Sequence, residues 1–125
     1  MRIAISATGR DLDSRLDSRF GRCPYFLVGD PETLEFEAVA NPGASAGGGA
    51  GVKAAQELVD RGVQVVITGQ CGPNAYDVLE AAGIKIFQAP EETLRRVLEL
   101  YREGKLAQLN GPGSAKQGLK GWGSQ

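Results

Sequence analysis

The chain contains no histidine, and its 125 residues include only two cysteines, one methionine and one tryptophan. The absence of imidazole removes the commonest general base and metal ligand, which excludes catalysis by a Ser/His or Cys/His pair. Two cysteines in a chain that lacks a secretion signal favour free thiols or metal ligands over a structural disulfide.

An excess of one charge and a long apolar run are also missing. With 14 basic and 15 acidic residues the net charge is −1, so the composition predicts no nucleic-acid partner and no anionic membrane partner. No apolar run approaches the ~20 residues of a membrane span, and the segment after Met1 lacks a signal-peptide core. We therefore expect a cytoplasmic protein, and the sequence sets no expectation for its oligomeric state.

The length suits one domain with a substantial core. We expect that domain over residues 1–109, because the chain from residue 110 to 125 is rich in glycine and contains lysines but no acid. Such a composition predicts a flexible tail, in which Trp122 is an isolated aromatic residue.

The stretch 63–79 predicts a buried strand, a tight loop and a helix, and the other elements can be placed relative to it. Its β-branched run predicts a strand buried on both faces, Gly69 and Gly72 break that run, and Pro73 suits the first turn of a helix. Open α/β sheets bind ligands outside the carboxyl ends of their strands. This junction, with Cys71 in its middle, is therefore the first candidate for a site.

The other elements follow from periodicity and from turn residues. Residues 9–22 predict a polar loop, in which Leu12, Leu16 and Phe20 would align if it formed one or two turns of helix. The predicted order is βββαβαβα, which indicates a mixed sheet with helices on its faces. The predicted strands are 2–7, 24–30, 34–40, 63–67 and 84–87, and the predicted helices are 52–61, 73–82 and 90–101.

Three stretches, 18–26, 41–51 and 68–75, together resemble the dinitrogenase iron-molybdenum cofactor biosynthesis family. The resemblance extends over the whole chain except the tail. It implies a ribonuclease H-like fold, with a mixed five-stranded sheet and the first strand central. It also implies binding of an iron–sulfur or iron–molybdenum cluster precursor at the motif residues, which are Phe20, Gly21, Arg22, Asn41, Pro42, Gly69, Gly72 and Pro73.

Arg19 departs from the family pattern. Many cluster-carrying relatives have histidine at this position, just before the Phe-Gly-Arg motif. Arginine is a permanent cation that binds anions but does not ligate metals. Arg19 is therefore a candidate contact for an anionic cofactor, and Arg22 is the candidate that we single out, because thiolate-bearing clusters are negatively charged.

Both cysteines are candidate metal ligands. The inferred topology places Cys23 and Cys71 at one sheet edge, with backbones about 10 Å apart across the first strand, which exceeds the ~7 Å limit for a disulfide. Two thiolates at that separation could hold an iron–sulfur cluster whose ligand set is completed by outside ligands, by a carboxylate or by a dimer, and a helix amino terminus would stabilise the Cys71 thiolate. The simpler alternatives are a buried apolar residue at Cys23 and a loop thiol without a function at Cys71.

Other chemistries fit less well. The glycines at 47–51 precede a predicted helix without the spacing of a phosphate loop, which leaves loop packing or an anion-binding helix start. The first strand carries no carboxylate, which argues against two-metal nuclease chemistry. A cysteine-dependent enzyme would have no base partner.

The sequence thus predicts a non-enzymatic carrier of an iron–sulfur or iron–molybdenum cluster, which acts between a donor and an acceptor protein in metallocofactor assembly. The alternative is a regulatory domain that binds a small molecule or anion without metal, through Arg22 and the glycine loop.

Overall fold

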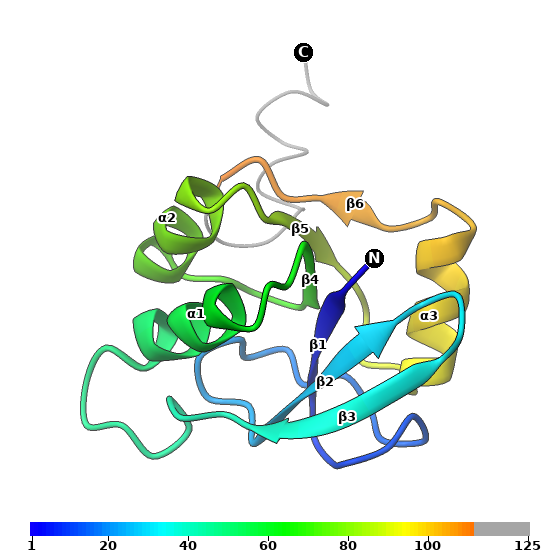
Figure 1. The fold of residues 1–125 in the computed structure, drawn as a ribbon, viewed down its shortest axis with the longest axis horizontal. Helices are drawn as coiled ribbons and strands as arrows, with labels where there is room; N and C mark the ends of the chain where they lie inside the picture. Colours follow the sequence, from blue (N-terminus) through cyan, green and yellow to red (C-terminus); the bar gives the residue numbers. More distant parts are fainter. Residues whose placement is uncertain (112–125) are drawn as a thin grey trace.

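The computed structural model describes residues 1–111 and contains one six-stranded sheet with three helices (Figure 1). The tail predicted for residues 110–125, including Trp122, lies outside the described residues beyond residue 111. In chain order the elements are β1 (Ile3–Ala7), β2 (Tyr25–Asp30), β3 (Glu35–Ala40), α1 (Ala50–Asp60), β4 (Val65–Thr68), α2 (Pro73–Ala81), β5 (Lys85–Gln88), α3 (Leu94–Arg102) and β6 (Ala107–Gln108).

The strands lie in the order β3-β2-β1-β4-β5-β6. The pairs β1–β4 and β4–β5 are parallel, whereas β1–β2, β2–β3 and β5–β6 are antiparallel. Ile5 of β1 pairs with Leu27 on one side and Ile67 on the other. The parallel strands therefore end at one edge of the sheet, where their following loops meet.

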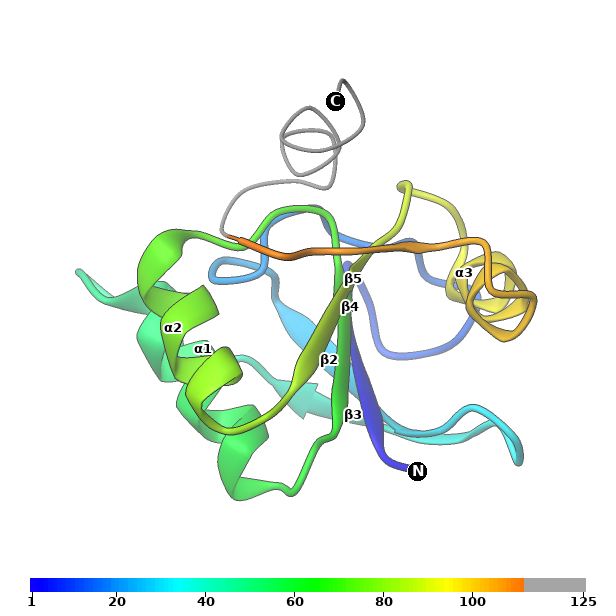
Figure 2. The same cartoon turned by 90° about the horizontal axis from the view of Figure 1, so that it is seen from above.

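Helices cover both faces of the sheet. In Figure 2, α1 and α2 lie against one face and α3 against the other. Because side chains alternate along a strand, Ala4 of β1 packs toward α1 and α2, whereas Ile3 and Ile5 pack toward α3. Two cores result, which we call the α1/α2 core and the α3 core, and all five residues of β1 are buried between them.

The structure confirms the α/β class and corrects the arrangement. The expected ribonuclease H-like order, with five strands as βββαβαβα, is wrong, because β6 follows α3 and adds a sixth strand. Only two residues of β6 pair with β5, through Phe87 with Gln108 and Gln88 with Ala107. A strand this short has no periodicity to detect.

The 9–22 segment forms no helix. Its backbone pairs with distant segments instead: Thr8 N donates to Arg15 O at 2.9 Å, and Leu16 N donates to Glu92 O at 2.9 Å. Leu16 is consequently buried in the α3 core and Phe20 in the α1/α2 core, on opposite faces of the sheet.

None of the helices within residues 1–111 is both long and apolar enough to cross a bilayer.

Candidate functional site

A pocket of about 330 Å³ lies where α1 and α2 begin. Its walls are residues 20–22, 49–52 and 72–75, and we call it the helix-terminus pocket. Except for Val52, every lining residue belongs to one of the three stretches that carry the family resemblance. Folding therefore brings these stretches together at the edge where β4 ends and α2 starts.

The amino ends of both helices supply the pocket with backbone donors. Gly49 caps α1 and Gly72 caps α2, and neither helix has a side-chain cap or an acidic residue in its first turn. Pro73 has no N–H, but within residues 1–111 no hydrogen-bond partner exists for the N–H groups of Ala50, Gly51 and Val52 of α1, or Asn74 and Ala75 of α2. The positive ends of two helix dipoles thus meet at one hollow.

Small residues make this convergence possible. A Cβ on Gly21 would lie 3.0 Å from Cα of Gly51, and a Cβ on Gly51 would lie 3.1 Å from Cβ of Ala75. Larger side chains would push the three walls apart. Gly21 therefore permits close packing of the walls and itself lines the pocket.

Arg22 supplies the charge of the pocket. Its Nη1 donates to Ala46 O at 2.6 Å and lies 3.5 Å from the carbonyl oxygens of Gly43 and Ala44. The loop before α1 therefore holds the guanidinium at the pocket, where no acidic side chain is among the described lining residues.

Asn41 positions the loops rather than lining the pocket. Its buried side chain donates from Nδ2 to Gly21 O at 3.1 Å and to Cys23 O at 2.8 Å, and its Oδ1 accepts from Gly43 N at 2.8 Å. The Asn41 amide thus connects the segment around Arg22 with the loop before α1, whose carbonyl oxygens accept hydrogen bonds from Arg22. Pro42 follows it and is exposed.

Arg19 lies outside the helix-terminus pocket. Its Nε and Nη2 bond the two carboxylate oxygens of Asp17 at 3.0 and 2.8 Å, and its backbone N–H bonds the same carboxylate at 2.9 Å. The hydrogen bond from the Arg19 side chain lowers the pKa of Asp17, although burial of the carboxylate opposes this shift. Arg19 therefore neutralises a buried carboxylate.

Gly69 and Gly72 have separate roles. A Cβ on Gly69 would lie 2.6 Å from Cα of Ser18, so this glycine permits close backbone contact and is not in the pocket wall. The neighbouring Gln70 bonds both flanks of that contact, by donating from N to Ser18 O at 2.8 Å and by accepting from Phe20 N at 3.3 Å. Gly72, in contrast, lines the pocket and has no atom within 4 Å of its Cβ position.

Both cysteines are buried in the α1/α2 core and neither lines the pocket. Burial is the main cause that raises the pKa of Cys23 and of Cys71 to about 12 in each case. The thiolate stabilisation expected for Cys71 near a helix terminus is therefore outweighed by desolvation. Residues 1–111 hold no group of three or more His, Cys, Asp or Glu side chains that could bind a metal ion, and the two-thiolate site stays a prediction.

The sequence alone did not single out Ala50, Val52, Asn74 and Ala75, whose contribution is backbone N–H groups rather than side chains. A signal for them exists: both helices begin after glycine and have no acid in the first turn. That pattern leaves a helix terminus open to an anion.

The sequence matches the family model described as dinitrogenase iron-molybdenum cofactor over residues 1–104. An uncharacterized protein of Methanocaldococcus jannaschii is 31% identical over 97 residues, which span 75% of this chain and 82% of that protein. The solved apo form of the orange protein from Desulfovibrio gigas is 41% identical with a TM-score of 0.84, over 89% of this chain and 94% of that one. A Thermotoga protein described as a candidate NifB protein is 38% identical with a TM-score of 0.76, over 86% and 92% of the two chains.

Proposed function

This chain belongs to the dinitrogenase iron-molybdenum cofactor family, and from that premise we propose that it binds an anionic metal–sulfur cluster, or a precursor of one, in the helix-terminus pocket. It would carry this cargo between a donor and an acceptor protein of cofactor assembly in the cytoplasm, without catalysing a reaction.

The observation that carries the proposal is the chemistry of the pocket wall. Five backbone N–H groups without partners in the described part of the chain belong to residues that line the pocket with Arg22, and this lining has no carboxylate and no thiol. Such a wall recognises negative charge, and none of its side chains is a thiolate, an imidazole or a carboxylate that would ligate iron or molybdenum. It therefore suits an anion whose metal atoms already have a full set of sulfide ligands.

This mode of binding suits a carrier. Hydrogen bonds from N–H groups and a guanidinium hold the cargo without coordinate bonds to the protein, so release requires no ligand exchange at the metal. The described lining residues also include no carboxylate, thiol or imidazole that could act in acid–base or nucleophilic chemistry, and Arg22 is the one charged side chain among them.

The same wall supports the second candidate, a regulatory domain that binds a metal-free anion such as phosphate. Both functions depend on Arg22 and the helix termini, and they differ in which anion binds more tightly.

Titration with tetrathiomolybdate, molybdate and phosphate, followed by backbone NMR, tests the proposal. We expect tetrathiomolybdate to bind most tightly and to shift the amides at 50–52 and 74–75. Arg22→Gln should weaken binding at least about fivefold, as expected for loss of a charge-assisted hydrogen bond. Lys85→Gln, an equal change of charge at the exposed first residue of β5, serves as the matched control.

The outcomes separate the candidates. Tighter binding of phosphate would favour the regulatory domain. Unchanged affinity in Arg22→Gln, or shifts outside the helix-terminus pocket, would overturn the site. If a Cys23→Ala, Cys71→Ala variant that folds normally lost tetrathiomolybdate, thiolate ligation would replace the anion pocket.

A further inference from the structure

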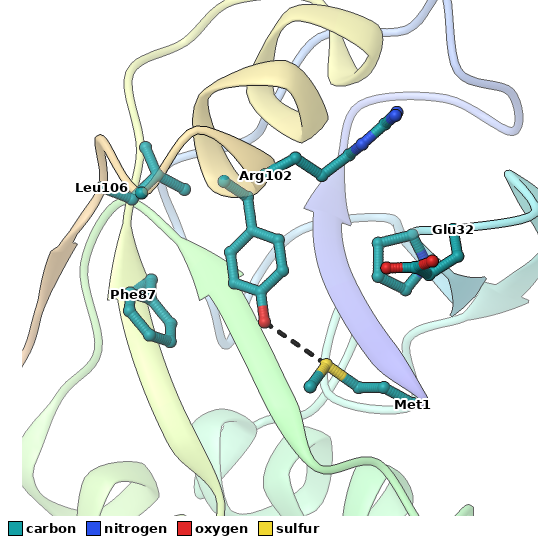
Figure 3. Close-up of a pocket in the computed structure, with 8 residues that line it drawn as sticks. Met1, Glu32, Phe87, Arg102 and Leu106 are labelled. Atoms are coloured by element: carbon teal, nitrogen blue, oxygen red, sulfur yellow. Dashed lines mark hydrogen bonds between the residues drawn. The ribbon is translucent and has the colours of Figure 1, made fainter.

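A second pocket, of about 560 Å³, lies on the α3 face of the sheet (Figure 3). Its wall comes from Met1, the turn between β2 and β3, β5, the end of α3 and the segment before β6. Phe87, Tyr101 and Leu106 in this wall pack against the α3 core, whereas the helix-terminus pocket adjoins the α1/α2 core. The two pockets are therefore on opposite faces of the sheet, and we call the second one the aromatic pocket.

One side of the aromatic pocket is apolar. The rings of Phe87 and Tyr101 meet edge to face, with centroids 5.5 Å apart at 81°. Leu106 adds an aliphatic surface beside Phe87 in Figure 3. Such a surface favours a third ring over a small polar ligand.

The hydroxyl group of Tyr101 has a weak partner. It donates to Sδ of Met1 at 3.3 Å, and a thioether sulfur is a poor acceptor. Burial also raises the pKa of Tyr101, so the group stays protonated and able to donate. A ligand carboxylate would accept this hydrogen bond more strongly than sulfur does.

The other side of the pocket is charged. In Figure 3, Glu32 and the guanidinium of Arg102 both lie on the side away from Phe87 and Leu106, apart from one another. Both side chains are exposed, and neither has an ion pair within residues 1–111. The turn fixes the backbone at Glu32, because its N–H donates to Oδ1 of Asp30 at 2.7 Å.

We propose that the aromatic pocket binds a free aromatic amino acid. The ring would pack on Phe87 and Leu106, the carboxylate would accept hydrogen bonds from Arg102 and Tyr101, and the ammonium group would pair with Glu32. One zwitterion with an aromatic side chain matches the apolar wall, the hydroxyl donor and both unpaired charges. A ligand with only one of these groups leaves part of the wall without a partner.

NMR titration of the full chain with L-phenylalanine at millimolar concentration tests the proposal. We expect saturable shifts at Phe87, Tyr101 and Arg102. Tyr101→Phe, Arg102→Gln and Glu32→Gln should each weaken binding about threefold to tenfold, because each removes one charge-assisted contact. Arg96→Gln changes the charge of the same helix outside the pocket and should leave the affinity unchanged.

Fragments of the ligand identify the contacts. Phenylacetate lacks the ammonium group and should be insensitive to Glu32→Gln, whereas phenethylamine lacks the carboxylate and should be insensitive to Arg102→Gln. The proposal is overturned if L-phenylalanine gives no saturable shifts at the pocket, if L-alanine binds equally well, or if all three variants bind like the parent protein. None of these outcomes bears on the helix-terminus pocket.

Discussion

Arg19 and Arg22 lie in the same motif but meet different surroundings. Arg19 forms a two-pronged ion pair with Asp17, whose carboxylate is only 7% exposed. Arg22 bonds backbone carbonyls and stays at the mouth of a pocket. A buried carboxylate needs a fixed counter-charge, and carbonyl oxygens are weaker partners that an anion can replace. Arg22 is therefore the freer of the two guanidinium groups to exchange its partners for a ligand.

The two buried thiols lead to a prediction about alkaline stability. Folding raises the pKa of Cys23 and Cys71 from an ordinary value near 9 to about 12, so the folded protein keeps protons that the unfolded chain releases. The free energy of unfolding should therefore be unaffected by the thiols below pH ~9 and fall above it, by about 1.4 kcal/mol per pH unit for each thiol. Urea denaturation at several pH values measures this slope.

A Cys23→Ala, Cys71→Ala variant isolates the thiols from the lysines and tyrosines that titrate in the same range. It should show a shallower loss of stability between pH 9 and 11, whatever its stability at neutral pH. Equal slopes in both proteins would mean that the thiols ionise freely in the folded state.

At the level of elements, the loop between β4 and α2 contains two glycines, and we expect their replacement by alanine to change the free energy of unfolding in opposite directions. Gly69→Ala should lower the free energy of unfolding by about 1–3 kcal/mol, because its Cβ would meet Ser18 at 2.6 Å. Gly72→Ala should fold with equal or slightly higher stability, since its φ of −68° suits alanine and the space is open. Thermal denaturation compares the two variants.

For ligand binding we expect the opposite ranking, in which Gly72→Ala is the more damaging of the two substitutions. The added methyl group of Gly72→Ala enters the helix-terminus pocket and should weaken tetrathiomolybdate binding, measured in the same variant. If Gly72→Ala were the less stable of the pair, the close contact would be assigned to the wrong glycine.

The first turn of α2 gives a second pair of opposed effects. Asn74→Asp preserves side-chain shape and places a negative charge at the helix amino terminus, so the helix should gain about 0.3–1 kcal/mol. The same charge lies in the pocket wall and should repel an anion. Chemical denaturation and tetrathiomolybdate titration of one variant should therefore move in opposite directions.

Asn110→Asp makes the same isosteric change away from both helix termini, and we expect little effect on either measurement. Tighter anion binding by Asn74→Asp would contradict the anion pocket, because a carboxylate at that wall favours a cation.

For the whole molecule, the helices and strands with clear periodicity could be predicted from the sequence, whereas backbone pairings of only one or two residues could not. The strand predicted at 63–67 lies within one or two residues of β4, and Pro73 starts α2 as expected. The helix predicted from residue 90 begins only at Leu94, after its N-cap Thr93. Backbone pairing of residues 15–16 with 92–93 keeps that segment extended, and no local pattern reveals such a pairing.

The candidate site, too, was predictable in part: the sequence indicated where the motif residues lie, but not how their side chains are oriented. The motif residues around Arg22 and Gly72 were predictable, because loops after parallel strands meet at one sheet edge. The direction in which each side chain points was not predictable. Cys71 and Gly72 are adjacent, yet Cys71 is buried in the α1/α2 core and Gly72 lines the pocket, and no local pattern in the sequence reveals this difference.

The segment that follows β6 adds a side chain to the core, and its contribution to stability can be measured. Leu109 follows β6, is only 3% exposed, and donates from its N–H to Ile86 O at 2.8 Å. Its side chain joins the α1/α2 core, so Leu109→Ala should lower the free energy of unfolding by about 2–4 kcal/mol in urea denaturation. Gln108→Ala, at the exposed neighbouring position, should change it by less than about 0.5 kcal/mol. Equal effects of the two substitutions would mean that the sheet ends at β5 and that the chain after α3 adds nothing to the core.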